Sequence, residues 1–291
     1  MIRGKRIPLC DVTANSHWKE PMNPHSPRVL FESAGVLALW KPAGLATQAP
    51  PGIPSAESWV RQQLHGRSPT GYVGVPHRLD RGVSGVVLFA ATPRAARKLS
   101  RQFERRQIVK VYRAIVECRA AAAATVDQLL QPTTNLADAD GGSQCPDEPL
   151  TWRDFVEKIP DEARARIVTA SEPGGREAVT RVRLIRRLPS DRMPAERLLL
   201  ELSPVTGRMH QLRLQAAARG LPVVGDDLYG SGDEGWAVPH SPGEECDPAD
   251  RDLRTRPIAL HACRITYADP DTACAVTVDA PVPEFWPQTA R

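Results

Sequence analysis

The stretch that most constrains the fold is residues 74–91, where a polar turn runs directly into a short apolar run. The apolar part, Val86–Ala91, is short and rich in β-formers, so it predicts a buried strand. Gly82 and Gly85 precede it and supply the backbone freedom that a sharp turn into a buried strand requires. The polar side chains of the turn are therefore expected at the N-terminal end of a buried strand.

Charged side chains fill this turn, where Asp80 stands between Arg78 and Arg81. Nearby guanidinium groups favour the ionised form of a carboxyl group, and such a carboxylate can act as a nucleophile or a base on an anionic substrate. A solvated ion pair or an Asx turn is the structural alternative. A third interpretation is a hydrolase that uses His77, Asp80 or Ser84, although triad members normally come from separate segments.

The sequence HRLDRGVSG at 77–85 resembles the HRLDxxTSG signature of the RluA-type RNA pseudouridine synthases. Three further segments resemble motifs of that family, in the family's order. They are LALWKPAGLAT at 37–47, KVYRAIVE at 110–117, and TGRMHQLRLQAAARGLPVVGDDLYG at 206–230 followed by LHACRITY at 260–267. Four motifs in order are a more specific signal than one, and the similarity covers residues 29–267.

The resemblance implies an enzyme that isomerises specific uridines in structured RNA, either rRNA or tRNA, to pseudouridine. This reaction cuts the N-glycosidic bond, turns the base over within the site and rejoins it through carbon-5. It has no redox step, so no cofactor and no metal are expected. The target base must leave its stack, which costs about a few kcal/mol. A catalytically silent RNA-binding protein of the same fold remains the alternative.

Three residues are candidates for the chemistry: Asp80, Tyr112 and Arg213. By resemblance, Asp80 is the catalytic aspartate, and it attacks the sugar, attacks the ring or removes a sugar proton. Tyr112 matches a tyrosine that lies against the target base, although a strand tyrosine is ordinarily a core residue. Arg213 matches the arginine that pairs with the aspartate and offsets its desolvation, although a helical arginine is ordinarily a surface residue.

Basic charge is concentrated near this site, although the net charge is only +4. Residues 93–113 hold eight Arg or Lys residues against one acid, as expected of a face that binds a polyanion. Arginines on the outer face of a helix beginning at Thr92-Pro93 either contact phosphates or remain in solvent. By resemblance, Arg78 takes the place of the flipped base or binds its phosphate. Lys41 either contacts a phosphate or is an exposed lysine in a turn. The candidates for RNA contact are His77, Arg78, Lys41, Arg94, Arg97, Lys98, Arg101, Arg208 and His210.

The fold implied by the resemblance is α+β, with a mixed, mostly antiparallel curved sheet, flanking helices and a central cleft. Periodicity alone supports only a mixture of helices and strands. The catalytic domain is expected over 29–291, after a polar arm at 1–28 that leaves no room for an N-terminal RNA-binding domain. Surface excursions are expected near 119–150 and 231–256, because their composition is typical of loops.

Apolar periodicity and capping residues predict the remaining elements. Two strands are expected within 28–40, around a turn at 32–35, and Ser55 is expected to cap a helix over 56–65. A second helix is predicted at 209–219 and ends at Gly220. Further strands are predicted at 110–117, 176–188, 197–203, 258–267 and 274–278.

Several protein classes are not indicated by the sequence. No run of 18 apolar residues occurs, so no transmembrane helix is predicted, and the N-terminus lacks the apolar segment of a signal peptide. The six cysteines form no CxxC pair, which predicts reduced thiols in a cytoplasmic protein. We expect a monomer that has no obligate protein partner and does not bind membranes.

Two positions depart from the family pattern. Val83 replaces the threonine usual in the signature and lacks the hydroxyl group that would anchor the turn. Gln215 stands where a histidine is common. Neither change removes a residue that is a candidate for the chemistry. Both are compatible with an enzyme that modifies a different uridine or has lower activity.

Overall fold

The computed structural model of the chain describes residues 26–65, 71–119, 122–130, 149–189, 196–230 and 256–290. Nearly all of the arm expected at 1–28, and most of the excursions expected near 119–150 and 231–256, therefore lie outside the described residues. The chain forms two compact units. The first contains the residues up to Tyr112 together with Val238–Thr289, and the second contains Arg113–Ala237.

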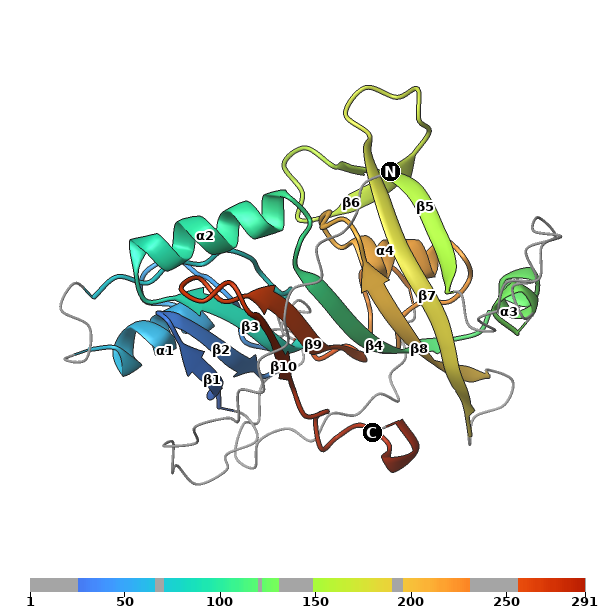
Figure 1. The fold of residues 1–291 in the computed structure, drawn as a ribbon. Helices are drawn as coiled ribbons and strands as arrows, with labels where there is room; N and C mark the ends of the chain where they lie inside the picture. Colours follow the sequence, from blue (N-terminus) through green and yellow to red (C-terminus); the bar gives the residue numbers. More distant parts are fainter. Residues whose placement is uncertain are drawn as a thin grey trace, which may run out of the picture. The chain divides into compact units, whose positions relative to one another are not determined.

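The first unit is built on a sheet with β3 at its centre (Figure 1). The strands β1 (Arg28–Ser33), β2 (Val36–Lys41) and β3 (Ser84–Ala90) form two antiparallel pairs. On the other side of β3, β9 (Leu260–Ala268) pairs in parallel, and β10 (Ala275–Asp279) pairs with β9 antiparallel. All seven residues of β3 are buried, as its apolar sequence predicts.

Two glycines allow the close approach of β3 to the C-terminal part of the chain. Gly85 has φ +121°, and a Cβ atom there would lie 2.3 Å from the carbonyl oxygen of Ala262. A Cβ atom on Gly82 would lie 2.5 Å from the carbonyl oxygen of Arg256. These glycines are thus needed for strand contact as well as for the turn, which the local sequence alone does not reveal.

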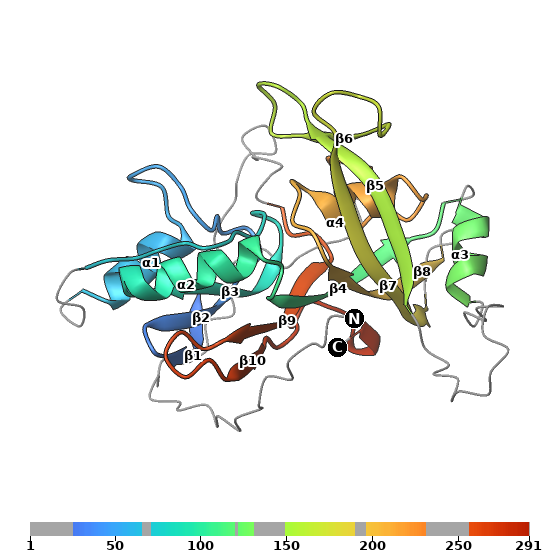
Figure 2. The ribbon, with the colours of Figure 1, turned by 45° about the horizontal axis from the view of Figure 1, so that its top comes forward.

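The helices of the first unit, α1 (Ala56–Gln63) and α2 (Pro93–Glu104), begin where the sequence predicts. Ser55 Oγ accepts a hydrogen bond from the Ser58 amide at 3.1 Å, and Thr92 Oγ1 accepts one from the Ala95 amide at 3.1 Å. Figure 2 shows α2 lying along β3 and β9, against which it packs. Its buried residues, Ala95 and Leu99, join the same hydrophobic core as β3.

The second unit is a sheet in the order β4-β8-β7-β5-β6. Its strands are β4 (Val109–Glu117), which begins in the first unit, β5 (Leu150–Lys158), β6 (Ala165–Val168), β7 (Arg176–Leu188) and β8 (Arg197–Pro204). The pairs β5–β6, β5–β7 and β7–β8 are antiparallel. Helix α3 (Ala123–Leu130) contacts β7, and α4 (Gln211–Ala217) contacts β5 and β6.

The prediction of a mixed, mostly antiparallel α+β fold is confirmed. The predicted strands and helices occur with small shifts in their ends, and α4 is shorter than expected. The sequence did not predict β5 and β6, and α3 lies within the stretch expected to be an irregular excursion. A 3₁₀ turn at Gln288–Ala290 ends the described chain. Within the described ranges, no helix is long and apolar enough to cross a membrane.

Candidate active site

The turn that carries Asp80 is tied on both sides to the segment that follows β2. Thr47 Oγ1 accepts a hydrogen bond from the Leu79 amide at 3.0 Å and donates one to the Leu79 carbonyl at 2.8 Å. The Gly44 amide donates to the Arg81 carbonyl at 2.8 Å. Both neighbours of Asp80 in the chain are therefore fixed, so its half-buried carboxylate projects from a restrained backbone.

Lys41 braces the same turn from inside the first unit, where its side chain is fully buried. Its Nζ donates to the carbonyl oxygens of Pro42 at 2.9 Å, Leu45 at 2.7 Å and Arg81 at 3.3 Å, which uses all three donors of an ammonium group. Burial lowers the pKa of Lys41 to about 7, while the charge of Asp80 opposes this change. This position fits neither an exposed turn lysine nor a phosphate contact, so Lys41 is a structural residue here.

Tyr112, on β4, is half-buried and lies within the electrostatic reach of the same carboxylate. Burial raises the pKa of its phenol, and the negative charge of Asp80 raises that pKa further. The phenol therefore keeps its proton at neutral pH and can donate a hydrogen bond. Because the charge of Asp80 acts on both Lys41 and Tyr112, the three residues form one cluster, which we call the Asp80 cluster.

His77 acts as a hydrogen-bond acceptor inside the first unit. Its Nε2 accepts the amide proton of Leu88 at 2.9 Å, and its ring stacks on Phe103 with centroids 4.6 Å apart. Since Nε2 accepts, a neutral ring carries its proton on Nδ1. Burial, and to a lesser extent the charge of Lys110, lowers the pKa of His77 to about 3. His77 therefore offers no positive charge to a phosphate group and instead anchors the signature to β3.

Ser84 and His261 form a buried pair that does not suit a hydrolase. Ser84 Oγ lies 2.9 Å from His261 Nδ1, and His261 Nε2 lies 3.2 Å from the Ala280 carbonyl oxygen. A carbonyl only accepts, so Nε2 carries the proton and Nδ1 accepts the serine hydroxyl. Both side chains are fully buried, so the pair links β3 to β9 without offering a nucleophile to a substrate.

The basic face of α2 consists of the exposed side chains Arg94, Arg97 and Arg101, which recur at helical spacing. Arg94 lies 3.4 Å from Asp271 in an exposed ion pair, which contributes little stability. Lys98, four residues after Arg94 on the same side of the helix, donates from its Nζ to the carbonyl of Pro270, next to Asp271. Of the four predicted RNA-contacting residues on this helix, the three arginines are exposed, whereas Lys98 is half-buried and bonded to the main chain.

Arg213 is held by a carboxylate in the second unit. Its Nε lies 2.6 Å from Asp226 Oδ2 and its Nη2 lies 2.7 Å from Oδ1, and the two side chains are 12% and 1% exposed. The guanidinium carbon lies 5.3 Å from the centre of the Tyr229 ring. His210 Nδ1 lies 3.0 Å from the Tyr229 hydroxyl. The predicted residues His210 and Arg213 therefore lie together, around a tyrosine that sequence reasoning did not single out.

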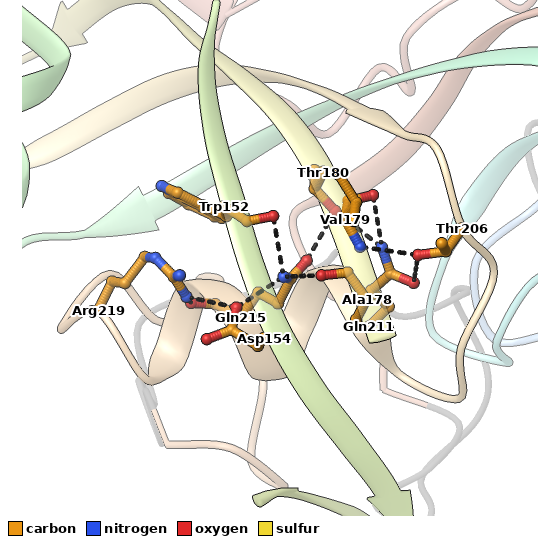
Figure 3. Close-up of polar contacts among 9 residues, drawn as sticks. All are labelled: Trp152, Asp154, Ala178, Val179, Thr180, Thr206, Gln211, Gln215 and Arg219. Carbon is orange, nitrogen blue, oxygen red and sulfur yellow. Dashed lines mark hydrogen bonds and ion pairs between the residues drawn. The ribbon is translucent and has the colours of Figure 1, made fainter. Parts of the chain in front are cut away.

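A chain of hydrogen bonds fixes α4 to β7 and β5 (Figure 3). Thr206 Oγ1 donates to Gln211 at 2.7 Å, and Gln211 Nε2 donates to Thr180 Oγ1 at 2.9 Å. Thr180 Oγ1 donates to Gln215 at 2.7 Å, and Gln215 Nε2 donates to Asp154 at 2.7 Å. Each group between the ends accepts on one side and donates on the other. Gln215 supplies one acceptor and one donor to this chain, a combination that a neutral histidine also offers.

The remaining candidates occupy two different settings. Arg78 is exposed in the turn beside Asp80. Arg208 is half-buried at the entry to α4, where its Nε donates to the Glu177 carbonyl at 3.0 Å and its amide donates to Gln211 Oε1 at 3.0 Å.

The structure thus brings the Asp80 cluster together in the first unit, and His210 and Arg213 together in the second. The pairing of Asp80 with Arg213 stays a prediction. Sequence reasoning missed Thr47, Asp226 and Tyr229 as site residues. Their only signal was their place within the motifs at 37–47 and 206–230. Across the described part of the chain, no group of three or more His, Cys, Asp or Glu side chains is arranged to hold a metal ion.

A family model described as RNA pseudouridylate synthase matches residues 35–218. An uncharacterized RNA pseudouridine synthase of Zymomonas mobilis is 33% identical over 208 residues, which covers 70% of this chain and 78% of that protein. The ribosomal large subunit pseudouridine synthase D of Neisseria meningitidis is 26% identical over 98% of this chain, which spans only 66% of the relative's length. The solved structure of human RNA pseudouridylate synthase domain containing 4 matches with a TM-score of 0.57 at 19% identity, and covers 88% of this chain and 89% of that one. This structural likeness supports the fold.

Proposed function

Since the chain belongs to the RNA pseudouridylate synthase family, we propose that it converts specific uridines in structured RNA to pseudouridine, with Asp80 as the catalytic aspartate. The observation that carries the proposal is the turn of Asp80, whose main chain is held by hydrogen bonds from Thr47 and Lys41 and whose carboxylate acts electrostatically on Lys41 and Tyr112. The names of several relatives refer to the large ribosomal subunit, so rRNA is the first substrate to test, and tRNA the second.

Each catalytic group has a proposed role. Asp80 attacks the sugar, attacks the uracil ring or removes a sugar proton, and the restrained turn suits all three. Tyr112 lies against the target base, where a protonated phenol donates a hydrogen bond without adding a second negative charge beside Asp80. Arg213 pairs with Asp80 and offsets its desolvation once the base enters the site. The reaction consumes no redox equivalent, so no cofactor takes part.

RNA binding is proposed to use the charged residues around this chemistry. Arg78, next to Asp80, takes the place of the flipped base or binds its phosphate. The arginines of α2 contact the RNA backbone, which fixes register without reading sequence. Arg208 and His210 contribute from the second unit. The protein is proposed to act on RNA in the cytoplasm as a monomer, without an obligate protein partner.

The test uses purified protein, unmodified rRNA and tRNA transcripts, and the Asp80→Asn variant. Pseudouridines are mapped by carbodiimide labelling and primer-extension stops. A discrete new stop with the wild-type protein, absent with Asp80→Asn, is the expected result. Filter binding of both proteins to the same transcripts is the control for folding and RNA affinity. Tight binding without a stop on any transcript would favour a catalytically silent RNA-binding protein instead.

A further inference from the structure

We propose that Asp226 and Tyr229 are positioning residues, which hold Arg213 and His210 in the geometry that the reaction uses. Both belong to the segment 225–230 that follows α4, which we call the α4 clamp. The inference rests on the proposed function, because it assigns Arg213 to the active site. It adds two side chains that act through Arg213 and His210 and are not themselves placed against the reacting atoms.

Asp226 joins the clamp to the guanidinium of Arg213. Its carboxylate is 1% exposed, and its two oxygens accept hydrogen bonds from Nε and Nη2 of Arg213. Oδ1 also lies 3.0 Å from the Leu228 amide and 3.2 Å from the Tyr229 amide. A buried carboxylate is costly unless it is paired and hydrogen-bonded, and this one meets both conditions. The same group therefore shapes the clamp and fixes one edge of the guanidinium.

Tyr229 contacts both candidate residues with a ring that is itself anchored. Its hydroxyl accepts a hydrogen bond, at 2.9 Å, from the amide of Ala165, which is the first residue of β6. The same hydroxyl lies 3.0 Å from His210 Nδ1, and the two rings meet edge to face with centroids 5.7 Å apart. The tyrosine also packs against the core formed by Val156, Ala165 and Leu214. It thus sets the position of His210 and covers one face of the Arg213 guanidinium.

The opposite side of α4 is held independently. Gln211 and Gln215 lie four residues apart on one face of the helix, where their amides bond to β7 and β5 (Figure 3). Arg213 lies midway between them in sequence, which places it on the other face. An arginine side chain loses much rotamer freedom when it is fixed. The glutamines hold the helix on one face, and the clamp holds the Arg213 guanidinium on the other. The Arg213 side chain is therefore already ordered before substrate binds.

The first experiment measures kcat and KM of Asp226→Asn on the transcript that the wild-type protein modifies, with Asp127→Asn, at an exposed position of α3, as the control. Asparagine keeps the shape of Asp226 but removes the charge and one acceptor. We expect a fall in kcat of about 10- to 100-fold, which is the scale of a small misplacement of a catalytic group. KM, RNA affinity and the unfolding temperature should stay close to the wild-type values, and Asp127→Asn should change none of these quantities.

A double variant tests whether Asp226 acts through Arg213. In an Arg213→Lys background, the Asp226→Asn change should lower kcat by less than threefold, because the guanidinium that it positions is absent. Equal effects of Asp226→Asn in both backgrounds would overturn the inference, as would an Asp226→Asn variant with wild-type kcat. Tyr229→Phe keeps the ring and removes the hydroxyl, so it tests the clamp even if Asp226→Asn does not fold. An unchanged kcat there would remove Tyr229 from the proposal.

A readout that needs no activity separates failure of this inference from failure of the proposed function. In ¹⁵N-labelled protein, the Nε–H signal of Arg213, identified by its loss in Arg213→Lys, should exchange slowly with solvent. Asp226→Asn should make that exchange at least about tenfold faster, because a charge-assisted hydrogen bond is lost. If the wild-type protein modifies no RNA but shows this protection, the proposed function fails and the clamp stands. Equal exchange in the two proteins would refute the clamp.

Discussion

At the residue scale, several polar side chains near Asp80 bind main-chain groups and not other side chains. Thr47 bonds to both peptide groups of Leu79, and Lys41 bonds to three carbonyls. His77 accepts the Leu88 amide. All three positions lie within the sequence motifs, but only Lys41 and His77 were singled out, and their residue types suggested charge. Their main-chain hydrogen bonds give both a different task, which is to hold the turn in one conformation.

The pH dependence of stability is expected to follow from the low pKa of the half-buried His77. Its pKa is about 3 in the folded protein, whereas the ordinary value of 6.5 applies to the unfolded chain. Between these two pH values, the unfolded chain therefore binds a proton that the folded chain does not. The free energy of unfolding should therefore fall as the pH drops below 6.5, by up to about 1.4 kcal/mol per pH unit from this residue. Urea unfolding at pH 7, 6 and 5 measures this slope.

His77→Gln should reduce that slope, because glutamine retains an acceptor for the Leu88 amide but does not titrate. His65→Gln is the control, since His65 is exposed at the end of α1. A slope that is the same in wild-type protein and His77→Gln would show that His77 is not the group responsible.

At the element scale, α1 and α2 were easier to predict than α3 and two of the strands. Ser55 and Thr92 mark the starts of α1 and α2 through local capping contacts, which a sequence displays directly. In β5, the residues Trp152 and Val156 alternate as in a half-buried strand, but Asp154 lies between them on the same side. That carboxylate is compatible with its position only because Gln215 and Arg219 bind it. Partners that distant leave no local signal.

The parallel contact between β3 and β9 should depend on Gly85. An alanine there would place Cβ 2.3 Å from a main-chain oxygen, at a φ of +121° that side chains rarely adopt. We expect Gly85→Ala to lower the free energy of unfolding by at least about 3 kcal/mol. Gly52→Ala is the matched control, because its φ is +86° but nothing lies within 4 Å of the added atom. Equal losses in urea unfolding would mean that backbone strain alone, without the steric contact, explains the effect.

The basic face of α2 predicts a salt-dependent contribution to RNA affinity. Removing one phosphate contact, as in Arg97→Gln or Arg101→Gln, should lower the slope of log affinity against log salt by about 0.7 to 1. Arg61→Gln is the control, since Arg61 is exposed on α1 and pairs with Glu57. Filter binding at several salt concentrations measures the slope. A slope that is unchanged in both α2 variants would place the RNA elsewhere.

At the scale of the whole molecule, the resemblance predicted the fold class, whereas local patterns predicted most of the elements, and the site residues that the resemblance named stay predictions. Neither indicated that residues 256–289 belong to the first unit again. The link between Ser84 and His261 joins residues 177 positions apart, and no periodicity reports such a pairing. The contacts of Arg213 could not be predicted either, because they depend on the path of the chain after α4.

If the two units serve one reaction, changes in each should affect kcat non-additively. We expect Tyr112→Phe and Arg213→Lys each to lower kcat, and the double variant to deviate from the product of the two effects by more than about twofold. Single-turnover rates on the modified transcript measure this coupling. Strict additivity would indicate that Tyr112 and Arg213 contribute to separate steps.

The hydrogen-bond chain from Thr206 to Asp154 has a fixed donor-to-acceptor direction, and this direction limits which substitutions the chain can accept at position 215. Turning the Gln215 amide around would set its carbonyl against the Asp154 carboxylate and its amino group against a hydroxyl that already donates to it. Leucine at 215 would leave the Thr180 hydroxyl without this acceptor and Asp154 with Arg219 alone, and glutamate would face a second carboxylate. Position 215 can therefore change alone only to a residue with the same order of acceptor and donor, such as histidine. Other exchanges must occur together with changes at 154 or 180, so a library randomised at these three positions should return correlated combinations.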